Sequence, residues 1–333
     1  MATAHQRKTD GYAMLLLLAL LAVGIQILLL SLIDIGERTN ERRTTAANST
    51  AEARQALIGW SATHGDLAAD IDPRPGNLPC PARDSDGNDD GNCSTAGGTS
   101  TGTLPWHSLA MVETRDANSV KLVYTIMDSF RRANLKRAAT NSDTDGTAMI
   151  ISADSYPLAV RSRDLMSIVE LRVLGEAKRA LAAYAGSHAG LYPNAAAPAD
   201  AICLENVSNI HAHTLCPARA GLCGGRLPED ALAPYAARWF TDNAWGRVTS
   251  YAVTAAKVAV ADAGCPTSIT VAGRQYDYVL VAPGPPLTGQ RRPSSTAADY
   301  LDDAISQSIW NPGSALDLAM PGAGSDDHVR GGP

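Results

Sequence analysis

The sequence EARQALIGWSATHGDL at residues 52–67 decides the fold, because it returns as EAKRALAAYAGSHAGL at residues 176–191. Both stretches contain, in the same order, a glutamate, a basic residue, Ala-Leu, an aromatic residue, a hydroxyl–histidine pair and a leucine. Self-similarity at this length is the mark of a duplicated structural unit. The sequence therefore predicts two copies of one unit.

Further matches follow the first in the same order in both halves. They are the phrase CPAR at 80–83 and 216–219 with a second cysteine after each, the pattern Gly-x-Leu-Pro at 102–105 and 225–228, and an aspartate before a tyrosine at Asp116…Tyr124 and Asp242…Tyr251. Chance is a poor explanation for four matches in one order. The duplication therefore extends over most of the chain.

Each copy is expected to be a helix followed by strands. In the second copy the apolar residues from Leu165 to Tyr184 fall at helical spacing, and in the first copy an alanine-rich helix is expected over 44–63. Strands are expected at 121–127, 147–152, 247–260, 268–271 and 276–281. Helix first and strands afterwards indicate the α+β class. The predicted units are 34–160 and 161–318, and the glycine-rich, polar segment 319–333 is predicted to be a disordered tail.

The segment YAMLLLLALLAVGIQILLLSLI at residues 12–33 is the longest apolar run and has no charge. Twenty-two helical residues span about 33 Å, enough for a bilayer core of about 30 Å. The run is longer than the core of a signal peptide, and no A-x-A cleavage site follows it. It is therefore predicted to be a retained transmembrane helix that merges into the amphipathic helix of the first unit, after a basic leader-like segment at 1–11.

The six cysteines and the charge point to a compartment and exclude one class of partner. All six lie after the apolar run, and their even number suits an oxidising compartment. The repeat suggests Cys80–Cys93 and Cys216–Cys223 as matching local disulfides, which leaves Cys203–Cys265 as the third. The net charge of −6 gives no footprint for binding nucleic acid.

One loop gathers four carboxylates: Asp84, Asp86, Asp89 and Asp90. Calcium takes six to eight oxygen ligands, so these residues are candidate calcium ligands; the alternative is a solvated acidic turn. Residues 141–146, NSDTDG, begin like an EF-hand loop but lack its closing glutamate. Cys203, His211, His213, Cys216 and Cys223 are candidate zinc ligands by type; the alternative, which the compartment favours, is that the cysteines form disulfides.

Recognisable enzyme motifs are missing from the sequence. It contains no G-x-S-x-G, no H-E-x-x-H and no P-loop. His64 and His188 occupy the same place in the two copies, where a positive charge suits the end of a helix. The sequence therefore favours a non-enzymatic protein over a periplasmic enzyme with an unrecognised site.

Several phrases carry a resemblance to a known family. Arg7 and Lys8 precede Gly11-Tyr12 and an apolar helix, and the phrases ALIGW (56–60), LPCPARDSDGNDDG (78–91), GTLPW (102–106), NSDTDGT (141–147) and VAPGPPLTGQ (281–290) follow. Together they resemble type IV prepilin-like proteins and the pseudopilins of type II secretion. The resemblance implies two pilin-like units and cleavage of the leader after Gly11, which would leave Tyr12 as the mature amino terminus. The family usually has glutamate at the fifth mature position, where this chain has Leu16.

The resemblance implies a function and a location. The chain is expected to be a non-enzymatic pseudopilin- or minor-pilin-like subunit of an envelope filament or secretion apparatus, at a tip or initiating position. The alternative is a static, membrane-anchored periplasmic binding or scaffold protein. Its partners would be membrane lipid and other pilin-like subunits or envelope machinery. It would cross the bacterial inner membrane once, with the C-terminal region in the periplasm.

Overall fold

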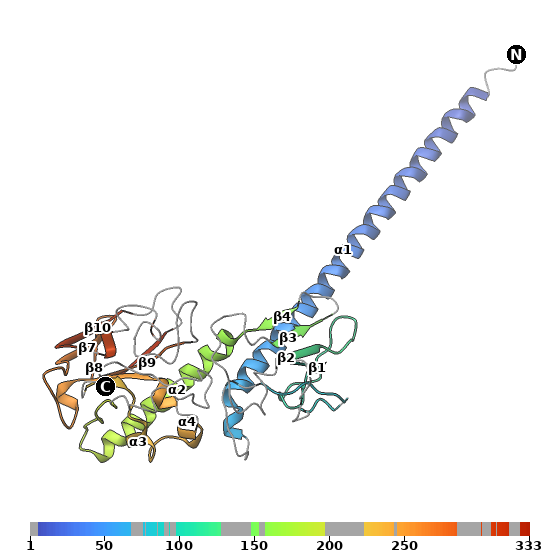
Figure 1. Ribbon diagram of the computed structural model, residues 1–333. Coiled ribbons are helices and arrows are strands. Elements are labelled where there is room, and N and C mark those ends of the chain that lie inside the picture. Colours follow the sequence, from blue (N-terminus) through green and yellow to red (C-terminus); the bar gives the residue numbers. More distant parts are fainter. Residues whose placement is uncertain are drawn as a thin grey trace.

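The computed structural model describes residues 6–67, 98–127, 148–152, 157–196, 223–242, 245–284, 312–319 and 327–333, together with parts of 76–93 and 301–310. Its longest element is the helix α1, Gln6–Leu67, whose 62 residues extend over about 93 Å. Figure 1 shows the N-terminal half of α1 projecting away from the rest of the molecule, while its C-terminal half lies within it.

The first unit is built from the end of α1 and one antiparallel sheet. The sheet has the strand order β1-β2-β3-β4, with strands Thr99–Thr103, Val123–Met127, Ala148–Ile151 and Leu158–Val160. From Ala46 onward α1 has a buried face at helical spacing, with Ala46, Ala53 and Leu57 at 0% exposure. This face packs with Tyr124 and Ile126 of the central strand β2.

The second unit begins with α2, Ser162–Ser187, and contains two sheets. The four-stranded sheet has the order β11-β9-β6-β5, and the three-stranded sheet has the order β10-β7-β8. The bounds of these strands are β5 Gly224–Arg226, β6 Ser250–Val253, β7 Ser268–Val271, β8 Arg274–Tyr276, β9 Tyr278–Ala282, β10 Ala315–Leu318 and β11 His328–Gly332. Short helices complete the unit: α3 Glu229–Leu232, α4 Arg238–Asp242, η3 Trp245–Val248, η4 Ala255–Lys257 and η6 Ser308–Trp310.

The α+β prediction is confirmed, with mostly antiparallel pairing; β10 and β7 are a parallel pair. The strand expected at 268–271 matches β7, and those expected at 121–127, 147–152, 247–260 and 276–281 contain most or all of β2, β3, β6 and β9. β4 ends at Val160 and α2 begins at Ser162, at the place where the sequence divides the two units.

The predicted disordered tail at 319–333 is wrong for its last residues. His328–Gly332 form β11, which pairs antiparallel with β9 from His328↔Ala282 to Gly332↔Tyr278. Composition misled the prediction because glycines at 331 and 332 lower strand propensity. The tyrosine rings beside them explain the glycines, since a Cβ added at either position would fall on the ring of Tyr276 or Tyr278.

The two units repeat the same hydrogen bonds at matching positions. In the first unit, the buried Tyr124 hydroxyl donates to the Pro79 carbonyl over 3.1 Å; in the second, Tyr251 donates to Pro193 over 3.0 Å. Each tyrosine lies opposite the glycine of a Gly-x-Leu-Pro phrase, in the pairs Gly102↔Tyr124 and Gly225↔Tyr251. The residue after each glycine forms a β-bridge with the residue three positions after the proline that accepts the tyrosine hydrogen bond, in the pairs Thr103↔Ala82 and Arg226↔Ala196. This arrangement fixes the loop between helix and sheet in both copies.

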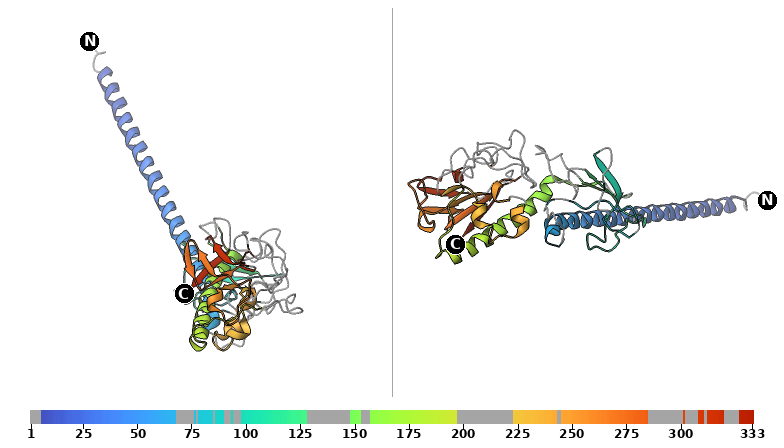
Figure 2. Two further views of the ribbon diagram at one scale, coloured as in Figure 1. Left: turned by 90° about the vertical axis from the view of Figure 1, so that its left-hand side faces the viewer. Right: turned by 60° about the horizontal axis from the view of Figure 1, so that its bottom comes forward.

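The units are joined through the ends of their helices. Leu165 of α2 lies in the core of the first unit, and Ala62 of α1 lies in the core of the second. The Arg54 guanidinium is 2.7 Å from the Asp164 carboxylate, and its Nε donates to the Ala159 carbonyl over 3.2 Å. Arg172 of α2 donates to the Ala62 carbonyl and lies over the Trp239 ring, 3.9 Å from its centroid. Figure 2 shows the two units side by side at the end of α1.

The membrane-spanning part of the prediction for residues 12–33 is not confirmed. In the described part of the chain, no helix combines the length and the hydropathy needed to cross a membrane. The side chains of residues 1–13 and 29–36 lie outside that part. The prediction that this segment is helical and runs without a break into the first unit is confirmed by α1.

Tyr124→Phe and Tyr251→Phe are expected to lower the free energy of unfolding by about 1 kcal/mol each. The change leaves a buried proline carbonyl without its hydroxyl donor, and loss of one such bond costs about this much. The two effects should add in the double variant, because the residues lie in separate cores. Denaturant titration monitored by circular dichroism measures all three values. Changes within about 0.3 kcal/mol of zero in both single variants would contradict this role for the hydroxyls.

Candidate functional site

The first candidate is the apolar surface of α1. Eleven large apolar side chains between residues 14 and 28 are each at least 50% exposed, with Met14 at 68% and Leu16 at 65%. They occur all round the helix, since every described side chain from 14 to 28 is exposed. A helix that is apolar on all sides is normally buried, either in a large core or in a membrane. This segment is therefore an apolar surface of a kind that is normally covered.

The following part of α1 has a different character. All side chains at 37–45 are exposed, and the sequence there, ERTNERRTT, is polar and charged. Burial begins only at Ala46, where the helix meets the first sheet. The polar segment therefore separates the apolar surface from the folded units. Gly11 and Tyr12, the predicted processing site, lie on α1, but their side chains are outside the described residues.

The acidic loop bonds to its own backbone. The Asp86 carboxylate accepts from the backbone and the side-chain amide of Asn88 over 2.8 and 2.7 Å, and Asp84 accepts from the Asp86 backbone over 3.4 Å. Asp89 accepts from the Cys80 N–H over 3.0 Å. Asp90 lies outside the described residues. In the portions of the loop that are described, and elsewhere among the described residues, no group of three or more potential ligands is placed to hold a metal ion.

Hydrogen bonds within this loop favour the ionised form of Asp86. The contact with Asp84 and the amide groups of Asn88 lower the pKa of Asp86 to about 2. Such hydrogen bonds favour the charged form of a carboxyl group. The Asp86 carboxylate therefore remains ionised well below neutral pH, and its hydrogen bonds to Asn88 are lost only as the pH falls through about 2. The described contacts match the alternative of a solvated acidic turn.

The remaining metal candidates lie largely outside the described residues. These are the EF-hand-like phrase at 141–146 and four of the five candidate zinc ligands, Cys203, His211, His213 and Cys216. The fifth, Cys223, forms a disulfide and so has no thiolate for a metal.

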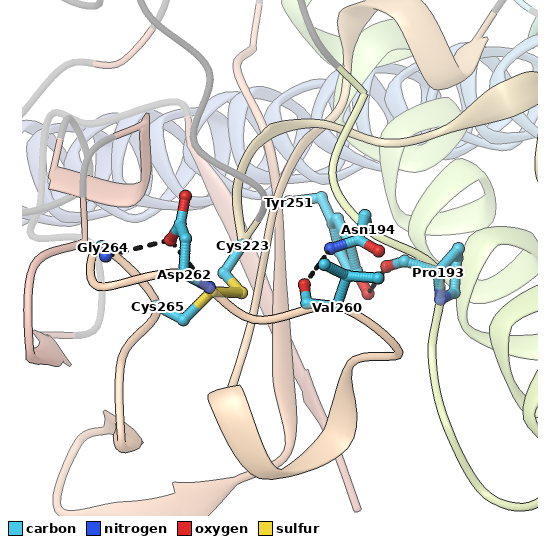
Figure 3. The surroundings of a disulfide bond; sticks show 8 residues. All are labelled: Pro193, Asn194, Cys223, Tyr251, Val260, Asp262, Gly264 and Cys265. Atoms are coloured by element: carbon cyan, nitrogen blue, oxygen red, sulfur yellow. Dashed lines mark hydrogen bonds between the residues drawn. A yellow bond between two sulfur atoms is a disulfide. The ribbon is translucent and has the colours of Figure 1, made fainter.

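The disulfides are partly as predicted. Cys80 is bonded to Cys93, which confirms the first pair. Cys223 is bonded to Cys265, so the predicted pairs Cys216–Cys223 and Cys203–Cys265 are wrong. Figure 3 shows this bond beside Asp262 and Gly264, with the Asp262 carboxylate accepting from the Gly264 N–H over 2.9 Å.

The predicted pair Cys216–Cys223 was wrong because the two CPAR phrases do not occupy equivalent positions in the two units. Pro79 and Pro193 accept the same tyrosine hydrogen bond in the two units, so the residue that matches Cys80 is Asn194. The Asn194 side-chain amide donates to the Val260 carbonyl over 2.6 Å (Figure 3). A hydrogen bond therefore holds the second copy where a disulfide holds the first. The repeated CPAR phrase does not mark equivalent bonds.

The histidine at the end of α2 bonds to its own helix. The His188 ring stacks on Tyr184, with centroids 3.8 Å apart, and its Nδ1 is 2.8 Å from the Tyr184 carbonyl. A carbonyl only accepts, so Nδ1 carries the proton and is not a base for the adjacent Ser187 hydroxyl. Ser187 Oγ lies 2.9 Å from this Nδ1, 2.8 Å from the Tyr184 carbonyl and 2.8 Å from the Tyr235 hydroxyl. The side chain of His64 is outside the described residues.

Comparison of the chain with protein-family models, with curated proteins and with solved structures finds no match. Functional argument therefore depends on the residues of the chain itself. Of these, the apolar surface at 14–28 departs furthest from what a folded protein leaves exposed to water.

Removing the Cys223–Cys265 pair by serine substitution at both positions is expected to lower the melting temperature more than removing Cys80–Cys93. The second-unit bond joins residues 42 apart and the first-unit bond residues 13 apart. The loop-entropy relation gives about 4 and about 3 kcal/mol for closing such loops. Calorimetry measures the shifts, and non-reducing peptide mapping checks the pairs. A peptide joining Cys216 to Cys223 would contradict the assignment.

Proposed function

We propose that the chain is a non-enzymatic, pilin-like subunit that is anchored in a membrane through the N-terminal half of α1 and joins other subunits through the same helix. One observation carries the proposal: an uninterrupted helix is apolar and exposed on all sides at 14–28 and is packed into a folded unit from Ala46 onward. Burying one leucine-sized side chain contributes about 1.5–3 kcal/mol. Lipid before assembly and neighbouring helices afterwards would provide that burial.

The sequence around the exposed segment adds to this support. The uncharged run extends over residues 12–33, which as a helix spans about 33 Å. A bilayer core is about 30 Å thick. The disulfides Cys80–Cys93 and Cys223–Cys265 suit a location of both units in an oxidising space such as the periplasm. The proposed location is therefore the bacterial inner membrane, crossed once.

The position at Leu16 favours a low-copy role. In the pilin-like family that the chain resembles, this position usually holds a glutamate, which pairs with the amine of a neighbouring subunit inside the filament. Leu16 provides no carboxylate, and an unpaired charge buried among apolar helices is costly. A subunit at a tip or in an initiating complex makes fewer such contacts than one in the shaft. Two folded units also form a bulky head for a tightly wound filament.

Paired substitution of Leu17 and Leu21 by arginine is expected to release the protein from membranes. Arginine at the centre of a membrane helix costs about 2.5–3.5 kcal/mol, and two such residues would outweigh much of the apolar burial. The matched control is the same change at Asn40 and Thr44, which are also four residues apart and are exposed in the polar part of the same helix. Carbonate washing followed by immunoblotting measures the partition. Equal retention of both variants, or release of the unsubstituted protein, would contradict anchorage.

Subunit counting tests assembly. Quantitative mass spectrometry of filaments purified from the native organism should find this chain at a small fraction of the major subunit, with Tyr12 as its first residue. A ratio near one to one would place it in the shaft. An intact leader, with no chain in filaments, would favour the alternative of a static anchored binding or scaffold protein.

A further inference from the structure

The edge of β9 and the rings of Tyr276 and Tyr278 form the site in which β11 lies, called its seat below, and this site fits the sequence of β11. On one edge it pairs with β9, and the Asp277 N–H donates to the Gly332 carbonyl over 2.9 Å. Glycine is required at two consecutive positions, because a Cβ at Gly331 would fall on the Tyr276 ring and one at Gly332 on the Tyr278 ring. The seat therefore selects a segment with two adjacent glycines.

Polar groups around the seat hold the strand by its backbone and one side chain. The Tyr192 hydroxyl donates to the Pro333 carbonyl over 2.6 Å, and Lys178 Nζ of α2 lies 3.5 Å from the Gly331 carbonyl. His328 Nε2 lies 3.6 Å from the carboxylate of Glu170, a side chain of α2 that is 1% exposed. These contacts fix the register of β11 as well as its place.

β11 itself contributes little to the core. Its valine, Val329, is only partly buried, and Arg330 is exposed. Adjacent glycines also make the segment a poor strand former in isolation. Among the described strands, β11 has one neighbour, so detaching it breaks a single ladder. The cost of withdrawal is therefore small beside that of opening either core.

Without β11, in contrast, the edge of β9 would be exposed and would readily pair with another strand. All five residues of β9, YVLVA, are buried, with exposures of 0–2%. A long apolar strand edge without a partner is a template for pairing with another chain. The glycine requirement rejects ordinary strands and accepts the segment HVRGG. The occupant that fits is β11 of a second copy.

We infer that β11 exchanges between copies of this chain, so that β11 of one molecule pairs with β9 of another. Every contact that holds β11 in its own chain is reproduced in the exchanged pair, which is the condition for domain swapping at low cost. Nine residues, 319–327, separate β10 from β11 and can span at most about 30 Å. The inference does not depend on the proposed role of α1, because both partners in the exchanged pair belong to the second unit.

Two full-length chains with one added cysteine each test the exchange. One carries Val329→Cys and the other, labelled with ¹⁵N, carries Val281→Cys; these positions face one another across β11 and β9. Equal mixtures in detergent are oxidised mildly at rising protein concentration. Peptide mapping is expected to find a bridge between the labelled and unlabelled chains that increases with concentration. The matched control pairs Val329→Cys with Val279→Cys, which is out of register by two residues, about 7 Å, and should give at least tenfold less.

Two further variants decide the outcome. Gly332→Ala on the chain that carries Val329→Cys should abolish the bridge, because the added methyl group meets Tyr278. A single chain with both Val281→Cys and Val329→Cys, oxidised while dilute, locks β11 in place; mixed with the labelled Val281→Cys chain, it should then form no bridge between chains, even if Gly332→Ala fails to fold. If no bridge between chains forms while the double variant closes its own, β11 stays in its own chain and the inference is wrong. Equal bridging in and out of register would also overturn it.

Discussion

The burial of one helix face against one antiparallel sheet is the contact on which the whole structure depends, and the chain makes it twice. In the first unit the face of α1 that includes Ala53 and Leu57 covers β2. In the second, the face of α2 that includes Val173 and Ala177 covers the sheet through Tyr251 and Leu280. A four-stranded sheet with one apolar face is not stable by itself in water, so each helix is a necessary layer of its unit.

Periodicity was sufficient to predict these helices and the central strands, because burial imposes spacing on the sequence. Most apolar positions of α2 from Leu165 to Leu181 are buried as their helical spacing indicates, although Ile168 and Leu171 are each 39% exposed. The edge strands β1 and β5 were missed because their sequences, TSTGT and GGR, have no alternating apolar pattern. Their signal was the Gly-x-Leu-Pro phrase: the glycine sits opposite the buried tyrosine in each unit.

The features that sequence could not supply are those that join residues far apart in the chain. Cys80 and Cys93 are close in sequence, and their bond followed from the pattern; Cys265 is brought to Cys223 only by the fold of the second unit. β11 has the composition of a disordered tail, and its order comes from Tyr276, Tyr278 and Tyr192, which precede it by many residues. The same holds for Arg172, whose contacts with Ala62 and Trp239 come from both units.

The exchange of helix ends between the two cores has a mechanical consequence for α1. Because Leu165 packs in the first core and Ala62 in the second, neither unit can rotate about the other without opening apolar contacts in both. Arg54 and Arg172 add charged and carbonyl contacts across the same junction. α1 is continuous from the apolar surface at 14–28 to this junction, with no break in its helical hydrogen bonding. Any surface that fixes the rotation of the N-terminal half of α1 therefore also fixes the direction in which both units face.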